Sequence, residues 1–167
     1  IIEAHKRISP FINKTPIHTS KSVNKILGTN IYLKCENFQK VGAFKYRGAT
    51  NAVQLLTDEQ KNRGVATHSS GNHAAALALA AKVAGTKAYV VMPKTAPQVK
   101  KDAVKFYGAE ITFCEPTLEA RESTLNKIVE KTGATFIHPY NRPDIITGQG
   151  TACLELMQEA ENLDIVM

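Results

Sequence analysis

The sequence lacks tryptophan, and aromatic residues make up only 7% of its 167 residues. With 10 glycines and 7 prolines it is also too poor in both for a collagen-like or low-complexity chain. No apolar run approaches the ~20 residues that a membrane-spanning helix needs, and the N-terminus, IIEAHKRISP, lacks the apolar core of a signal peptide. Because 43% of the residues are hydrophobic, we expect a globular fold with a proper core, and neither export nor a membrane.

Cysteine is scarce as well. Cys35, Cys114 and Cys153 lie far apart, and an odd number cannot form a closed set of disulfides. The absence of a CxxC pair excludes a zinc ribbon and a thioredoxin-type motif. We therefore expect three reduced, core-type cysteines in a cytoplasmic protein.

The net charge of +6 is unevenly distributed. Residues 1–56 carry nine Lys or Arg and two acidic residues, whereas the remainder carry twelve and thirteen. The lysines are scattered, and neither zinc-finger spacing nor an RNP-like aromatic string accompanies them. We therefore expect a solvated basic surface and no binding of nucleic acid.

From residue 64 onward, short β-prone runs alternate with helical stretches that end near a glycine. The expected strands are Val65–His68, Ala88–Met92, Glu110–Phe113 and Thr135–His138, and the expected helices are Asn72–Ala84, Ala96–Tyr107 and Leu118–Lys131. This βαβ rhythm predicts an α/β fold with a parallel sheet between covering helices.

The segments outside this alternation are less regular. We expect helices at Ala4–Ile12, Lys21–Leu27 (with Ser20 as N-cap and Gly28 as C-cap), Ala43–Leu56 and Gln149–Asn162, and a strand at Ile31–Cys35. The last residues, Leu163–Met167, have the pattern of another buried strand that has just begun. We therefore expect the sequence to be the first part of a longer protein.

Two segments could carry chemistry. Ser69-Ser70-Gly71-Asn72-His73 lies between an expected strand and helix, where open parallel sheets bind ligands and free N–H groups face an anion. We favour a carboxylate or phosphate site there, although a helix cap at Ser70 or Asn72 would explain part of the run. Lys45, near the start of an amphipathic helix, is either an ordinary surface lysine or a partly desolvated amine able to form a Schiff base.

Together these segments resemble fold-type II pyridoxal-phosphate enzymes (tryptophan synthase β-like), specifically the serine racemase and serine/threonine dehydratase group. The resemblance runs along essentially the whole chain and rests on KCENFQ (34–39), GAFKYRGA (42–49), THSSGNHAAALALAAK (67–82), YGA (107–109), CEP (114–116), HP (138–139) and GQGT (148–151). THSSGNH, CEP and Arg121 look more like eukaryotic serine racemases than like biosynthetic threonine deaminases.

The resemblance implies racemisation of L-serine to D-serine with accompanying dehydration to pyruvate and ammonia. Lys45 would hold pyridoxal 5′-phosphate and move the α-proton of an amino acid substrate, and Ser70 would be the second acid/base. Racemisation needs two such groups, because a proton leaves one face of Cα and another arrives on the opposite face. The implied cofactor-binding residues are Lys45, Phe44 and Asn72, and the implied substrate-binding residues are Ser69, Ser70, Asn72, His73 and Arg121.

The resemblance also implies partners. Lys40, Val41 and Tyr107 match positions where the racemases bind an activating nucleotide, ATP, between the subunits of a homodimer. Ala75 stands where some racemases carry a glutamine for that nucleotide, and Tyr140 stands where the mammalian-type pattern has asparagine. A divalent cation, Mg²⁺, would find its ligands outside this chain, so we expect no metal site within it.

The family's layout assigns residues 1–53 and 142–167 to a large cofactor domain and residues 54–141 to a small mobile domain. Its glycine-rich phosphate loop would follow Ile165–Met167, so we expect the 167 residues alone to hold the cofactor weakly or not at all. Two alternatives stay open: a dehydratase for threonine or threo-3-hydroxyaspartate with little racemase activity, and a non-catalytic α/β module that only binds an anion.

Overall fold

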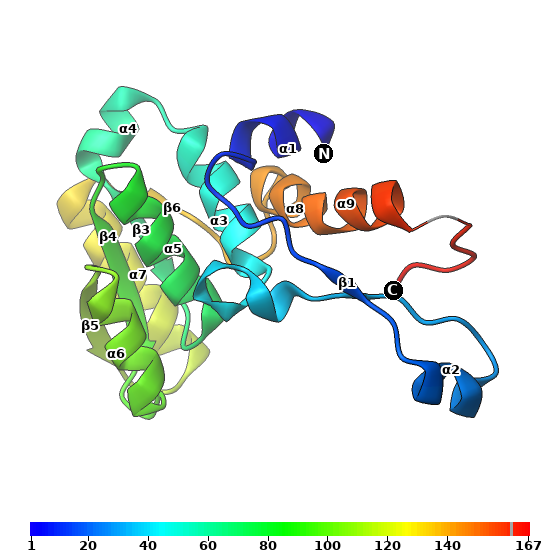
Figure 1. The fold of residues 1–167 in the computed structure, drawn as a ribbon. Helices are drawn as coiled ribbons and strands as arrows, with labels where there is room; N and C mark the ends of the chain where they lie inside the picture. The colour runs from blue at the N-terminus through cyan, green and yellow to red at the C-terminus, as the bar shows by residue number, and fades with distance from the viewer. Residues whose placement is uncertain (161) are drawn as a thin grey trace.

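The structure, a computed structural model, describes residues 1–160 and 162–167 (Figure 1). Its central feature is a four-stranded sheet in the order β5-β4-β3-β6, in which all neighbours are parallel. The strands are β3 (Val65–His68), β4 (Ala88–Pro93), β5 (Glu110–Cys114) and β6 (Thr135–Phe136). Val65 is paired with Ala88 on one side and with Thr135 on the other. The predicted α/β class with a parallel sheet is confirmed.

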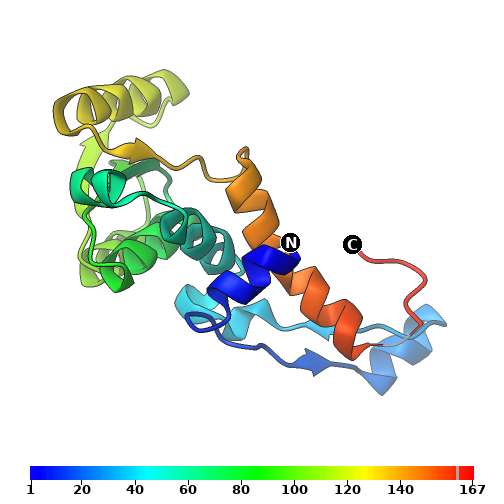
Figure 2. The same ribbon diagram turned by 90° about the horizontal axis from the view of Figure 1, so that it is seen from above.

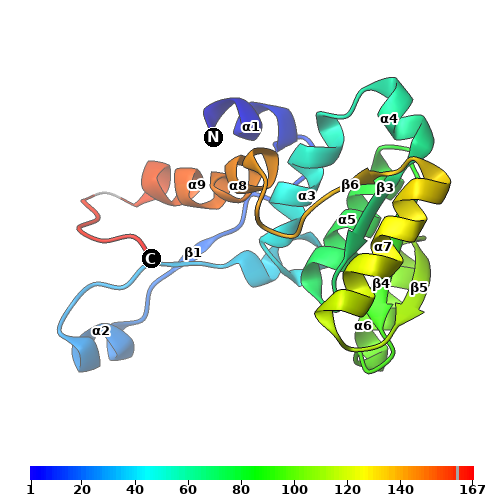
Figure 3. The same cartoon turned by 180° about the vertical axis from the view of Figure 1, so that it is seen from behind.

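Helices cover both faces of this sheet. The helices α5 (Asn72–Val83) and α6 (Gln98–Phe106) lie on one face and α7 (Leu118–Thr132) lies on the other, as views from opposite sides show (Figures 1 and 3). The connection through α5 leads from β3 to β4, whereas the connection through α7 leads from β5 back past β4 and β3 to β6. The order of strands therefore reverses between β3 and β6, and open α/β sheets bind their ligands beyond the carboxyl ends of such a strand pair.

A second pair of helices is joined to α5 through one of its members, α3 (Lys45–Gln54). The other member is α8 (Pro143–Gln149), and the two helices cross at two glycines. A Cβ on Gly48 would lie 2.9 Å from the Ile145 carbonyl oxygen, and one on Gly148 would lie 2.8 Å from the Gly48 Cα. The small side chains of α5, which is buried along most of its length, allow a similarly close approach of α3. The start of α3 is thereby held beside the sheet.

The remaining elements extend away from the sheet. They are α1 (Ile2–Ile8), β1 (Ile17–His18), α2 (Lys21–Leu27), β2 (Leu33–Lys34), the 3₁₀ turns η1 (Glu36–Phe38) and η2 (Lys40–Gly42), α4 (Asp58–Arg63) and α9 (Thr151–Glu159). The antiparallel pair β1–β2 and α2 form an arm at the end of the molecule far from the four-stranded sheet (Figure 2). The arm's helix has no buried residue.

Some local predictions are confirmed and others are wrong. Ser20 caps α2 by accepting a hydrogen bond from the Val23 N–H, and Gly28 ends it with a φ of +66°. The helix predicted at Gln149–Asn162 is present as the shorter α9, whereas α8, which precedes it, was not predicted; Glu161 lies outside the described residues. The strand predicted at Leu163–Met167 is wrong, since among the described residues no strand lies beside it and its last three residues are exposed.

Among residues 1–160 and 162–167, no helix is both long and apolar enough to cross a membrane.

Candidate active site

Lys45 lies at the first position of α3, beside the reversal between β3 and β6. Its Nζ donates a hydrogen bond to the Pro139 carbonyl oxygen at 3.0 Å, in the segment that follows β6. Its ammonium also lies 5.0 Å from the centre of the Phe44 ring, which is 41% exposed. Burial lowers the pKa of the Lys45 amine below its ordinary value, because water that would solvate the ammonium is removed. A lowered pKa favours the neutral, nucleophilic amine that Schiff-base formation requires.

The turn between β3 and α5 presents backbone donors to open space. Ser69 donates its N–H to the Val91 carbonyl oxygen, and its hydroxyl accepts from the Gly71 N–H at 3.3 Å. Gly71 is the N-cap of α5 and has no side chain to cap the helix; the Ala74 N–H donates to the Gly71 carbonyl oxygen, and the N–H groups of Asn72 and His73 stay available. No atom of residues 1–160 or 162–167 lies within 4 Å of the position that a Cβ on Gly71 would occupy. The N-terminus of a 12-residue helix therefore faces a space in which an anion is favoured.

His73 lies behind this turn and is buried, with 3% exposure. Its Nε2 lies 3.3 Å from the Ile137 carbonyl oxygen, and its Nδ1 is buried without a hydrogen-bond partner among the described residues. Burial lowers the pKa of His73 to about 4, and the nearby Lys45 charge adds to this effect, although the hydrogen bond to Ile137 opposes it. The ring is therefore neutral at neutral pH and donates from Nε2.

Acid should destabilise the fold through His73. Above pH 6.5 the ring is neutral in both the folded and the unfolded state, so it does not change the free energy of unfolding with pH. Between pH 6.5 and about 4, only the unfolded state takes up the proton. Stability is therefore lost as the pH falls through this window, by about 3 kcal/mol in total. Urea unfolding as a function of pH should show this slope, and His73→Gln, which keeps a donor for Ile137, should flatten it. An unchanged slope in the variant would contradict a neutral buried imidazole.

Asn72 is exposed at the first position of α5 and has a partner that the sequence did not reveal. Its Oδ1 accepts a hydrogen bond of 2.7 Å from Lys100 Nζ, which comes from the first turn of α6. The sequence offered only a weak indication of this contact: a lysine so close to a helix N-terminus opposes the helix dipole, so it is unexpected unless its side chain has a separate partner.

Arg121 lies in the first turn of α7, on the face of the sheet opposite the one that α5 and α6 cover. Its Nε is buried and has no hydrogen-bond partner among the described residues. Desolvation lowers the pKa of His68, and the charges of His138 and Arg121 lower it further, while Glu122 opposes them. The ring centres of His68 and His138 lie 6.4 Å apart. A cavity of about 340 Å³ opens here, lined by His68, Leu118, Glu122, Leu125, Asn126, Phe136, His138 and Tyr140. His68, the last residue of β3, and His138, which follows β6, line this cavity, and the motifs had assigned neither of them a role.

The three residues predicted to bind a nucleotide lie on elements packed around α5. Lys40 and Val41 belong to η2, and Tyr107 follows α6 directly. Lys40 Nζ donates to the Phe11 carbonyl oxygen at 2.5 Å. Val41 has a φ of +59°, which is strained for a β-branched residue, so this turn is held by its surroundings.

Within the described residues, no group of three or more His, Cys, Asp or Glu side chains is arranged to hold a metal ion.

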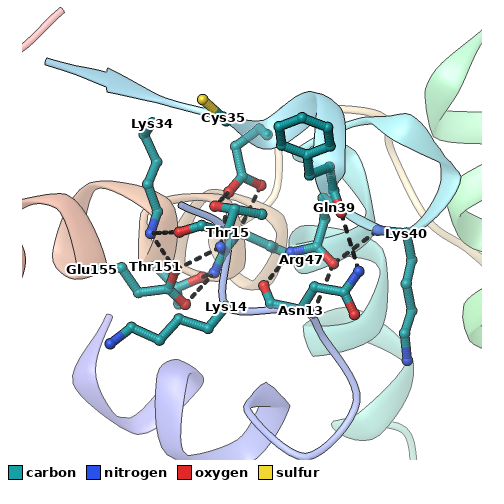
Figure 4. A network of polar contacts seen from close by, with 12 residues as sticks. Asn13, Lys14, Thr15, Lys34, Cys35, Gln39, Lys40, Arg47, Thr151 and Glu155 are labelled. Carbon is teal, nitrogen blue, oxygen red and sulfur yellow. Dashed lines mark hydrogen bonds and ion pairs between the residues drawn. The ribbon is translucent and has the colours of Figure 1, made fainter. Parts of the chain in front are cut away.

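A buried ionic network fixes α3 and hence Lys45 (Figure 4). Arg47, fully buried, donates two hydrogen bonds of 2.8 Å to Glu36 and two, of 2.7 and 2.8 Å, to Glu155, and a fifth of 3.2 Å to the Thr151 hydroxyl. Lys34 Nζ lies 2.8 Å from Glu155 and donates to the Thr15 carbonyl oxygen. Burial alone would raise the pKa of Glu155, but its hydrogen bonds from Arg47 and Lys34 outweigh this and lower the pKa. The network joins α3 to η1 and α9.

Comparison with known proteins gives consistent matches along the chain. The model of the family "Pyridoxal-phosphate dependent enzyme" matches residues 8–167. The β-hydroxyaspartate dehydratase of Paracoccus denitrificans is 53% identical over 100% of this chain and 53% of its own length. The serine racemase of Dictyostelium discoideum is 51% identical, over 100% of this chain and 52% of its own length. The structure of maize serine racemase has a TM-score of 0.96 and 47% identity, over 98% of this chain and 50% of that chain. The chain therefore spans about half the length of these relatives.

Proposed function

Because this chain belongs to the family of pyridoxal-phosphate-dependent enzymes, we propose that it carries the reactive-lysine half of a serine racemase that also dehydrates serine. The observation that supports this most directly is the meeting of two features at the reversal between β3 and β6. A half-buried amine with a lowered pKa, Lys45, contacts the segment after β6. The uncapped N-terminus of α5 follows β3 and faces open space.

The residues present fit the cofactor. Lys45 offers the amine, the exposed Asn72 amide offers donors for a ring oxygen, and the exposed Phe44 ring offers an apolar contact. When bound, pyridoxal phosphate would delocalise the negative charge that develops at Cα as its proton leaves. The protein supplies placement and proton transfer.

The substrate carboxylate binds at the start of α5 in this proposal. Ser69 and Ser70 supply hydroxyls, and the first-turn N–H groups of the helix supply backbone donors. His73 contributes its backbone N–H rather than its ring, because Nε2 faces the Ile137 carbonyl oxygen and Nδ1 is buried. Arg121, whose buried Nε has no hydrogen-bond partner among the described residues, attracts a polar or acidic substrate side chain.

Proton transfer uses two groups. Lys45 Nζ removes the α-proton from one face, and Ser70 Oγ returns a proton to the other, which inverts the configuration. Loss of the β-hydroxyl after the first proton transfer gives dehydration, which needs no group on the second face. One site therefore yields both products, in a ratio that Ser70 controls.

Ser70→Ala in the full-length protein should separate the two reactions. We expect D-serine formation to fall by about 10²-fold, because a positioned acid/base is lost, while L-serine dehydration falls only a few-fold. Chiral chromatography of serine and a coupled pyruvate assay measure the two rates. Ser123→Ala, on the exposed face of α7, is the matched control and should change neither. Equal losses in both reactions would show that Ser70 is not the second-face group.

A dehydratase of threo-3-hydroxyaspartate with little racemase activity is the second candidate. It is favoured by the 53% identity to the β-hydroxyaspartate dehydratase and by the Arg121 Nε, which has no hydrogen-bond partner in the described part of the chain and suits a second carboxylate. The ratio of kcat/KM for hydroxyaspartate dehydration to that for serine racemisation in the wild-type protein decides between the two candidates.

The assembly is part of the proposal. Residues 1–53 and 142–167 would contribute to a large domain and residues 54–141 would form a small one, which is supported by the fact that the strands of the parallel sheet all lie between residues 65 and 136. Closure of the small domain would exclude water from the carbanion. A cytoplasmic homodimer, activation by ATP at Lys40, Val41 and Tyr107, and Mg²⁺ held by ligands outside this chain complete the proposal.

A further inference from the structure

We propose that Lys100 is a positioning residue that turns the Asn72 amide so that its N–H groups face the cofactor, an inference that rests on the proposed function. Lys100 is the third residue of α6, and Asn72 is the first residue of α5. The two side chains meet through the hydrogen bond of 2.7 Å between Lys100 Nζ and Asn72 Oδ1. No motif assigns Lys100 a role.

The polarity of this contact selects one orientation of the amide. An asparagine side chain has an acceptor oxygen and an –NH₂ group with two donors, whereas an ammonium group can only donate. Lys100 therefore holds Oδ1, and the –NH₂ group of Asn72 points elsewhere. The 3′-oxygen of pyridoxal phosphate, when ionised, can only accept, so it requires this orientation. Asn72 is exposed, and among the described residues no second hydrogen bond holds its side chain.

The position of Lys100 is unfavourable for helix stability alone. It lies in the first turn of α6 and also reaches the first residue of α5, so its charge is next to two positive helix ends. Neither helix has an acidic residue in its first turn. A bound anion removes this repulsion, which is why a cation placed here is suited to an anionic ligand.

The lysines near Lys100 do not share its contact with Asn72. Lys101 Nζ donates to the Lys94 carbonyl oxygen at 2.6 Å, and Lys94 forms an ion pair with Glu115. Lys105, in the last turn of the same helix, is exposed. A change at Lys105 therefore alters the charge of α6 by the same amount as a change at Lys100, at a distance from Asn72.

The test is the affinity of the full-length apoprotein for pyridoxal phosphate, measured by titration of its visible absorbance. Lys100→Met should raise the Kd about 10-fold, the effect of losing one charge-assisted hydrogen bond. Lys100→Arg, which can still donate, should stay within about 3-fold of wild type, and Lys105→Met should not change the Kd. Far-UV circular dichroism checks that the variants remain folded.

A double-mutant cycle distinguishes positioning from a general effect of charge. If Lys100 acts through Asn72, Lys100→Met should change the Kd less than about 2-fold when Asn72 is already alanine. An equal loss in both backgrounds, or no loss in the single variant, would overturn the inference and leave the proposed function intact. A wild-type protein that binds no pyridoxal phosphate would instead overturn the proposed function and this inference together.

Discussion

Replacing Lys45 with alanine should abolish both reactions of the full-length protein, with losses on the order of 10⁴-fold. The variant loses the only group that this proposal assigns to covalent attachment of the cofactor, and it loses the first-face acid/base at the same time. Ser70→Ala removes one of two proton-transfer groups, so its effect should be smaller and confined to racemisation. Lys45→Ala should spare neither product.

The measurement combines rate with absorbance. Wild-type protein mixed with pyridoxal phosphate should become yellow as the Schiff base forms, and Lys45→Ala should not show the band. Lys25→Ala, in the exposed last turn of α2, should behave as wild type. Added methylamine, a small amine that can replace the missing side chain, should restore part of the dehydration in Lys45→Ala.

Two outcomes would contradict this assignment. A full-length wild-type protein with no visible band would favour the non-catalytic module that binds only an anion. A Lys45→Ala variant that keeps the band would show that another lysine holds the cofactor. The hydrogen bond between Lys45 and the Pro139 carbonyl oxygen, together with the lowered pKa of the amine, makes Lys45 the lysine to test first.

Local patterns predicted the parts of the site better than their arrangement. The run Val65–His68 is a strand with the bounds predicted from its β-prone residues. The Ser69–His73 turn lies after it and leads into the alanine-rich α5, as the alternation of strands and helices predicted. Which strand lies beside β3 depends on pairing across about 70 residues, and this information is absent from any short window.

Side-chain partners distant in the sequence were beyond prediction for the same reason. Lys100 and Asn72 are 28 residues apart and Arg47 and Glu155 are 108 apart, so no periodicity relates them. The helix α4, by contrast, had a readable signal: Thr57 and Gln60 form a capping box at its start. The helix α8 was less readable, because Gly148 within it is required by the crossing with α3, which only the tertiary structure reveals.

Arg47→Met should destabilise the protein by about 3–5 kcal/mol, the range for breaking a buried ion pair by removing one partner. Arg47 uses all five of its N–H groups within the network, on two carboxylates and one hydroxyl. Methionine fills a similar volume but leaves both carboxylates without their guanidinium partner: Glu155 keeps the Lys34 ammonium at 2.8 Å, and Glu36 keeps the Thr15 hydroxyl. Glu155, with 2% exposure, cannot recover its hydration.

Urea unfolding of the variant and of two further proteins measures this effect. Arg63→Met removes an arginine whose ion pair with Glu59, at 2.6 Å, is no longer than the pair of 2.7 Å between Arg47 and Glu155. Both partners of the Arg63 pair are exposed. Arg63→Met should therefore cost less than about 1 kcal/mol. Adding Glu155→Met to Arg47→Met should recover part of the loss, because it removes the more deeply buried of the two orphaned carboxylates, while Glu36 keeps its hydrogen bond from the Thr15 hydroxyl.

Arg47→Met should also weaken cofactor binding at Lys45 under conditions in which the protein is still folded. Arg47 lies two residues after Lys45 on α3 and ties that helix to η1 and α9, so the loss of its hydrogen bonds frees the start of α3 to move. The affinity of Arg47→Met for pyridoxal phosphate should therefore fall even in the absence of urea, while that of Arg63→Met should not. If Arg47→Met were no less stable than Arg63→Met, the burial of the network would have no energetic consequence, and the position of Lys45 would have to depend on the glycine contact between α3 and α8 alone.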